Sequence, residues 1–279
     1  MLIKKINIIL LILMAVLYSY VFYWMANEWL TNPYYSHGIL IPLISGFIIY
    51  KKRIFKNLSE LEEKYEPGMY IFIFGMILYV IGFIRAFLFI SAISFLFTTT
   101  GIILYFYGKE VMKKLSFPLY YLIFAMPAPF VFLGQVALGL QRIAIASSSF
   151  LISLFGLPVT TEGSEIQLQN YSFYVGLPCS GIYTLISLLA LTTVFIYILV
   201  CPFKKKLFLI LITIPIAILA NIIRVTLIIL IANSYGINAA MSFFHDFSSI
   251  ILFITAFVFL IIIARIMKCK MGGIIYGKI

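Results

Sequence analysis

The stretch Val175–Tyr183, with the sequence VGLPCSGIY, places one thiol where a polar segment gives way to a long apolar run. Cys179 lies between a proline and a Ser-Gly pair, and the apolar residues 182–200 follow at once. Such a run predicts a helix that begins just after the cysteine. The positive end of the helix dipole would lower the pKa of this thiol and favour the thiolate. A lone cysteine is more often a small buried apolar side chain, so the rest of the chain decides between these interpretations.

The composition around this stretch is that of an integral membrane protein. Of the 279 residues, 64% are hydrophobic and only 10% are charged, whereas soluble globular domains are about 25% charged. The net charge of +11 does not indicate a nucleic-acid partner, because the Lys and Arg residues fall in short connections between apolar runs. Two histidines and three cysteines without a CxxC pair predict no metal site and no cofactor. Cys201 and Cys269 lie among basic residues, and we expect both to be catalytically idle.

Apolar runs along the chain predict about eight transmembrane helices. The first run, residues 6–26, is too long for a cleaved signal peptide and lacks a small-x-small cleavage site, so we expect it to be retained. The other seven runs cover residues 36–50, 69–84, 87–107, 115–133, 180–200, 207–232 and 247–264. We therefore predict an all-α polytopic membrane protein in which residues 1–279 form a single transmembrane domain.

Residues 134–176 interrupt this pattern and are predicted to form an extracytoplasmic insertion. Polar residues within 134–155 favour an interfacial helix that lies along the membrane surface or in the outer part of the bundle. These polar residues are Gln135, Gln141, Arg142 and Ser147–Ser149. Polar and apolar residues then alternate over 165–169 and 171–175, which predicts a small β-hairpin. We expect the helix and the hairpin to shape a peptide cleft near Cys179.

The distribution of positive charge predicts the orientation of the helices. With the N-terminus inside, 17 of the 20 basic residues fall on the inner side, and the exceptions are Arg85, Arg142 and Arg224. The positive-inside rule then places both termini in the cytoplasm and the protein in the plasma membrane. Cys179 and His245 lie at the outer ends of their helices. Arg224 lies about 12 Å below the outer end of its own helix, at about 1.5 Å per residue.

Three reactive side chains from three helices are thus predicted to converge in the outer part of the membrane. An arginine inside the membrane is costly and marks a functional site by default. Asn221 lies three residues before Arg224 on the same helical face and is placed to orient the guanidinium. Cys179, His245 and Arg224 together suggest acyl transfer, in which the thiolate forms a thioester and the imidazole moves the proton. The guanidinium would stabilise the oxyanion or hold the substrate.

Four segments of the chain also carry a family resemblance. They are Gly176–Gly181 (GLPCSG), Asn221–Val225 (NIIRV), His245 and Tyr35–Pro42 (YSHGILIP). In order and topology they resemble the exosortase/archaeosortase family of membrane-embedded cysteine transpeptidases. The resemblance covers most of the chain, and the isoleucine- and lysine-rich composition favours an archaeosortase.

This resemblance implies a role for each matching residue. Cys179 is the nucleophile, Arg224 is the catalytic arginine and His245 is the third member of the site. Ser180, Gly181 and Asn221 are expected to bind substrate or to support these three. His37, in the YSHGILIP segment, is expected to support either the site or the fold.

The resemblance also implies the partners of this protein. The substrates are exported surface proteins with a C-terminal signal made of a short motif, a hydrophobic helix and a basic tail. Such a helix would lie in the bilayer beside the enzyme, with the scissile bond at the outer interface. The cleaved protein is then transferred to an acceptor, for which a membrane lipid head group is the expected candidate.

Three other functions remain open from the residues alone. A transporter or channel is disfavoured because all nine acidic residues lie in loops or at the ends of spans, which leaves no carboxylate inside the membrane. An assembly or anchoring protein would use Cys179 only as core filler. An intramembrane cysteine protease without acceptor transfer would share the first half-reaction and differ only in how the thioester is resolved.

Overall fold

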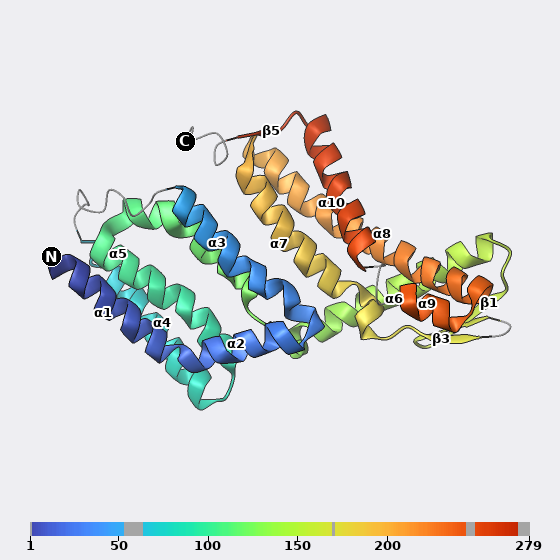
Figure 1. Ribbon diagram of the computed structural model, residues 1–279, viewed down its shortest axis with the longest axis horizontal. Coiled ribbons are helices and arrows are strands. Elements are labelled where there is room, and N and C mark those ends of the chain that lie inside the picture. Colours follow the sequence, from blue (N-terminus) through green and yellow to red (C-terminus); the bar gives the residue numbers. More distant parts are fainter. Residues whose placement is uncertain (1, 53–63, 169–170, 244–248, 273–279) are drawn as a thin grey trace. The chain divides into compact units, whose positions relative to one another are not determined.

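The computed structural model describes residues 2–52, 64–168, 171–243 and 249–272. These residues are mostly helical and group into two compact units, Met1–Pro129 and Phe130–Ile279 (Figure 1). Within the described residues, three helices are long and apolar enough to cross a membrane, and a bent helix pair would make a fourth. This supports a mostly helical membrane protein, whereas the eight separate spans are not confirmed.

The first unit is a bundle of apolar helices. In chain order its elements are α1 (Leu2–Leu17), α2 (Ser19–Thr31), η1 (Pro33–Ile39), α3 (Leu40–Lys51), α4 (Gly68–Ile84), α5 (Leu88–Tyr121) and η3 (Leu122–Ala125), where η denotes a 3-10 helix. The predicted run 69–84 is therefore confirmed as a helix almost to the residue.

The first predicted helix, over residues 6–26, is in fact two helices. α1 and α2 meet at Tyr18 with a bend of 60°. The Tyr79 hydroxyl donates to the Leu17 carbonyl at 2.7 Å, so a side chain from α4 satisfies a backbone group at the bend. The Tyr18 ring is fully buried, and its hydroxyl lies 2.8 Å from Ser94 Oγ and 2.9 Å from Thr98 Oγ1. Tertiary hydrogen bonds therefore stabilise a bend that an apolar run does not reveal.

The helix α5 reverses direction at Gly108. This residue has φ 74° and ψ −177°, a combination that only glycine adopts readily. Thr100 Oγ1 and the Tyr120 hydroxyl lie 3.2 Å apart, although 20 residues of straight helix would separate them by about 30 Å. The two arms on either side of Gly108 therefore run back along each other, and they match the two predicted runs 87–107 and 115–133, except that the second arm ends before Pro127.

Glycines bring α4 and the first arm of α5 into close contact. Gly68, Gly75 and Gly82 recur every seven residues on α4 and are buried. A Cβ atom at Gly75 would lie 2.6 Å from the backbone nitrogen of Thr98, and one at Gly82 would lie 2.7 Å from that of Ser91. Small residues at such spacing let two backbones approach closely, which is how helices associate where the hydrophobic effect gives no drive.

The second unit carries a small sheet and three helices packed side by side. Its elements are α6 (Phe130–Leu154), β1 (Val159–Glu162), β2 (Glu165–Leu168), β3 (Ser172–Tyr174), η4 (Leu177–Ser180), α7 (Ile182–Ile198), β4 (Leu199–Val200), α8 (Phe203–Tyr235), α9 (Ile237–Phe243), α10 (Ser249–Ile266) and β5 (Lys270–Met271). Figure 1 shows α7, α8 and α10 lying against one another. α7 and α10 lie close to the predicted bounds, and α8 is longer than predicted at both ends.

The insertion at 134–176 differs from its prediction in two respects. The predicted hairpin forms between β2 and β3, with Ile166 opposite Phe173, but β1 pairs with β2 and extends it to three antiparallel strands. α6 is one helix of 25 residues, and residues 133–154 are long and apolar enough to cross a membrane. α6 could therefore cross the membrane instead of lying at its surface as predicted. Its polar residues had led us to favour the interfacial position.

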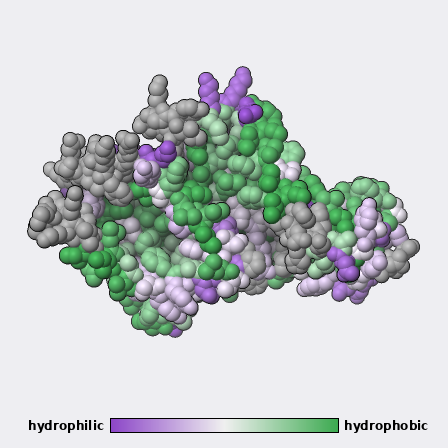
Figure 2. Space-filling model, viewed as in Figure 1, coloured by the Kyte–Doolittle hydropathy of each residue, from purple (hydrophilic) through white to green (hydrophobic). Residues whose placement is uncertain are grey.

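The exposed surface of the second unit has the character expected in lipid. Figure 2 shows hydrophobic side chains over α10 and hydrophilic ones gathered near β5. Seven large apolar side chains of α10 are more than 45% exposed, namely Ile250, Ile251, Ile254, Val258, Phe259, Ile262 and Ile266. An apolar face of this extent is typical of a membrane protein rather than of a soluble domain.

Candidate active site

Cys179 lies in η4, the short 3-10 helix that precedes α7. Its backbone N–H donates to the Gly176 carbonyl at 2.9 Å. The chain then passes through Gly181, whose φ of +82° lies in the left-handed region, and α7 begins at Ile182. The Ile182 N–H donates to Ser180 Oγ at 3.4 Å, so Ser180 satisfies the first backbone N–H of α7. The GLPCSG motif thus presents the thiol just before the start of a helix, as predicted.

The thiol packs on a small hydrophobic core formed by α6, α8 and the sheet. The buried members of this core are Ile145, Ile152, Ile166, Val175, Val225 and Ile229. Gln141 on α6 is 3% exposed and donates its side-chain amide to the Val175 carbonyl. The strand that leads to Cys179 is therefore fixed to α6 by a buried polar contact.

Asn221 on α8 is the residue that binds the backbone at Cys179. Its Nδ2 donates to the Cys179 carbonyl at 2.7 Å. A Cβ atom at Gly181 would lie only 2.7 Å from the Asn221 Cγ, so glycine at this position makes room for the amide. We predicted that Asn221 orients Arg224. The structure instead shows this amide bound to the backbone of Cys179, and its Oδ1 is buried without a hydrogen-bond partner among the described residues.

Arg224 lies one turn further along α8, only 8% exposed, with its charge acting on the thiol. Burial raises the pKa of the Cys179 thiol above its ordinary value, and the positive charge of Arg224 partly offsets this rise. The net direction is opposite to that predicted from the helix dipole alone. A raised pKa means that the thiol holds its proton more firmly than a free cysteine does, and this proton must leave before or during nucleophilic attack.

The Ile222 carbonyl of α8 accepts hydrogen bonds from two hydroxyls, and the one that comes from α6 fixes the position of α8 along that helix. Ser148 Oγ on α6 donates to the Ile222 carbonyl at 3.2 Å, and Thr226 Oγ1 donates to the same carbonyl at 2.9 Å. Ser148 is fully buried. Gln141 and Ser148 were missed as supporting residues, although their seven-residue spacing places them on one face of a helix. That spacing was the signal, whereas we had interpreted their polarity as the mark of a helix at the membrane surface or in the outer part of the bundle.

The predictions for the two histidines, His245 and His37, have different outcomes. His245 lies outside the described residues, so its role stays a prediction. His37 belongs to the first unit and makes a hydrogen bond with the backbone of Phe124. Nearby, Trp29 Nε1 donates to the Ala125 carbonyl at 2.7 Å, and the Tyr35 hydroxyl donates to the Ala128 carbonyl at 2.6 Å. Together these bonds fasten α2 and η1 to residues 124–128. They favour the structural role for His37, which stays a prediction.

The remaining cysteines, Cys201 and Cys269, pack against a different hydrophobic cluster of this unit from the one that Cys179 contacts. The strands β4 and β5 pair with Leu199 opposite Met271 and Val200 opposite Lys270, and the next pair in this register is Cys201 with Cys269. The two thiols are hydrogen-bonded. Among the residues that the structure describes, no group of three or more metal-ligating side chains occurs.

Comparison with known families now places the chain. The family model described as Transmembrane exosortase (Exosortase_EpsH) matches residues 29–262, a range that includes both η4 and the site residues of α8. This protein belongs to the transmembrane exosortase family. Exosortases are in general cysteine transpeptidases that act on proteins with C-terminal sorting signals. The search of curated proteins and the search of solved structures gave no match to this exosortase.

Proposed function

We propose that this exosortase cleaves the C-terminal sorting signal of exported surface proteins through a thioester on Cys179 and transfers them to an acceptor. The observation that carries the proposal is the arrangement of Cys179 against α8, where Asn221 binds its carbonyl and the buried Arg224 acts on its thiol. A thiol used only as core filler needs neither a buried amide on its backbone nor a buried guanidinium whose charge acts on it.

The reaction follows from these residues. The Cys179 sulfur attacks the scissile carbonyl while its proton passes to His245, and the guanidinium of Arg224 stabilises the oxyanion. The C–N bond then breaks, and the imidazolium returns the proton to the leaving amine. An acceptor nucleophile attacks the thioester, the C–S bond breaks and the thiol is restored. We propose a membrane lipid head group as this acceptor.

The proposed setting follows the charge distribution. We infer that both termini are cytoplasmic, that the whole chain acts as one transmembrane domain and that Cys179 faces the extracytoplasmic side. The hydrophobic helix of the substrate would then lie in the bilayer beside the enzyme, with its basic tail inside. The isoleucine- and lysine-rich composition favours the archaeal branch of the family.

The test is co-expression of the enzyme with a precursor that carries such a C-terminal signal. Cys179→Ala is expected to leave the precursor at full length, and the matched control Cys201→Ala is expected to process it normally. Mass spectrometry of the new C-terminus then identifies the acceptor. A head-group adduct supports transpeptidation, and a free carboxylate supports the alternative of a protease without acceptor. Normal processing by an inserted Cys179→Ala enzyme would refute the mechanism.

A further inference from the structure

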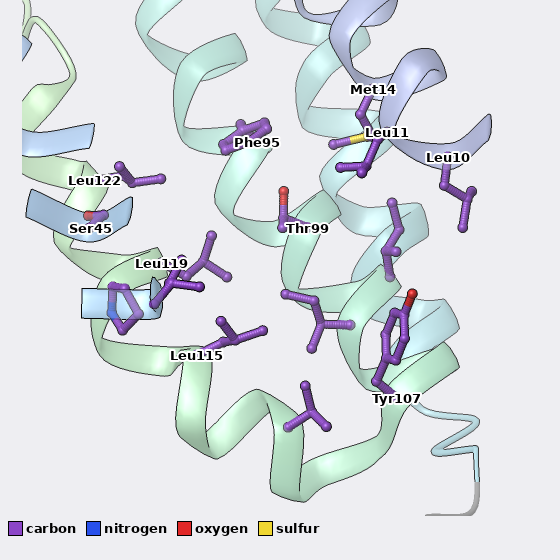
Figure 3. Close-up of a pocket in the computed structure, with 15 residues that line it drawn as sticks. Leu10, Leu11, Met14, Ser45, Phe95, Thr99, Tyr107, Leu115, Leu119 and Leu122 are labelled. Atoms are coloured by element: carbon purple, nitrogen blue, oxygen red, sulfur yellow. The ribbon is translucent and has the colours of Figure 1, made fainter. Parts of the chain in front are cut away.

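The first unit contains an apolar cavity of about 520 Å³. Its walls come from α1, α3, both arms of α5 and the first residue of η3. Figure 3 shows Leu11 and Phe95 on one part of the wall and Leu115 and Leu119, from the returning arm of α5, on another. The reversal at Gly108 thus places residues of both arms of α5 on the wall of one cavity.

Two hydroxyls in this apolar wall have no partner among the described residues. Ser45 on α3 is only 4% exposed, and both its Oγ and the Oγ1 of Thr99 on α5 are buried without a hydrogen bond. Both side chains line the cavity (Figure 3). The neighbouring Ser94 and Thr98 of the same arm donate to backbone carbonyls at 2.7 and 2.9 Å. Since buried hydroxyls are nearly always paired, the missing acceptor is expected to come from a molecule in the cavity.

The size and the wall of the cavity select the kind of molecule. A transmembrane helix is about 10–12 Å wide, so this volume holds little more than about one turn of it. Water alone is also a poor occupant, because cavities with apolar walls stay dry. At about 30 Å³ for a group of the size of a water molecule or a methylene, the space suits a chain of roughly 17 such groups.

We propose that this cavity binds one hydrocarbon chain of a membrane lipid, with an oxygen of the chain's ester or ether linkage accepting hydrogen bonds from Ser45 and Thr99. The surrounding bilayer supplies this ligand at high concentration. The site is independent of the peptide chemistry proposed for Cys179, since all of its lining residues belong to the first unit.

Photolabelling of the full-length protein tests this proposal. The protein is reconstituted in phosphatidylcholine vesicles that contain a small fraction of phosphatidylcholine with a diazirine in one acyl chain. After illumination, the labelled residues are mapped by mass spectrometry. We expect adducts concentrated on cavity residues such as Ile103 and Leu119. Adducts spread evenly over exposed apolar side chains such as Ile73 and Ile77 of α4, which do not line the cavity, would overturn the proposal.

Variants separate the cavity from general contact with lipid. Ile103→Trp fills the space and is expected to remove the cavity adducts. Ser45→Ala with Thr99→Val keeps the shape but removes both donors, and is expected to lower the labelling about fivefold for each hydrogen bond lost. Ser116→Ala is the matched control, because its hydroxyl bonds to the Lys113 carbonyl at the surface. Unchanged labelling in the double variant would refute the role of the hydroxyls even if Ile103→Trp fails to fold.

Discussion

The contact between Gly181 and Asn221 predicts a specific non-additivity. Gly181→Ala places a side chain at φ +82°, which costs about 1–2 kcal/mol for a residue with a Cβ atom. The new Cβ would lie 2.7 Å from the Asn221 Cγ, so the amide must shift and its bond to the Cys179 carbonyl is lost, for about 1 kcal/mol more. We expect the free energy of unfolding to fall by about 2–3 kcal/mol.

Asn221→Ala alone is expected to lower the free energy of unfolding by about 1–2 kcal/mol, because it removes the same hydrogen bond. In the double variant the clash is gone and the bond is lost only once. The loss of unfolding free energy in the double variant should therefore be smaller, by about 1 kcal/mol or more, than the sum of the losses in the two single variants. The measurement is unfolding in mixed micelles with increasing denaturing detergent, together with the alkylation rate of Cys179.

Gly139→Ala provides the control for this experiment. Gly139 lies in α6, and a Cβ atom there would meet nothing within 4 Å. We expect this substitution to leave the free energy of unfolding unchanged or to raise it by about 0.5–1 kcal/mol, since alanine favours a helix. If Gly181→Ala is as mild as Gly139→Ala, or if the double variant is additive within about 0.5 kcal/mol, the proposed packing of Asn221 is wrong.

Three further predictions test other parts of the structure. Because burial raises the pKa of the Cys179 thiol and Arg224 opposes this, alkylation should accelerate as pH rises, and Arg224→Gln should move the midpoint to higher pH; an unchanged or lower midpoint would contradict the electrostatic contact. Copper phenanthroline, as oxidant, should join Cys201 to Cys269 within one chain, seen as a loss of two hydrogens by intact mass, and no bond would contradict the register of β4 and β5. Gly108→Ala should destabilise the protein by about 1–3 kcal/mol in a thermal melt, and an unaltered melting temperature would count against the reversal of α5.

The sequence was informative wherever a pattern is local. The apolar runs of α4, α7 and α10 predicted these helices closely, since an apolar run of that length between charged residues has few alternatives in a membrane protein. The spacing of Cys179 and Arg224 relative to their helix ends predicted that both side chains lie at one site, and the charge of Arg224 does act on the pKa of the Cys179 thiol. Their catalytic roles stay a prediction. The alternation of polar residues predicted the pairing of β2 with β3.

The sequence was less informative wherever a partner distant in the chain decides the structure. The bend at Tyr18 depends on hydroxyls of α4 and α5, and nothing near residue 18 signals it. β1 has a sequence, VTTE, too short to be distinguished from a loop. Asn221 was predicted to act on its neighbour Arg224, but its bond goes to Cys179, which is 42 residues away. A polar residue in an apolar helix shows that a partner exists, without showing which partner it is.

The support of the site illustrates how a membrane protein fixes a position without help from the hydrophobic effect. Lipid tails are as apolar as leucine, so apolar packing alone gives α8 no fixed position along α6. A hydroxyl that binds one particular carbonyl fixes this position, because a shift of α8 by one residue would break the bond. The carbonyl that Ser148 and Thr226 share belongs to Ile222, which lies between Asn221 and Arg224. The two residues that act on Cys179 therefore flank the point at which α8 is held, and this short distance leaves them little freedom to move relative to the thiol.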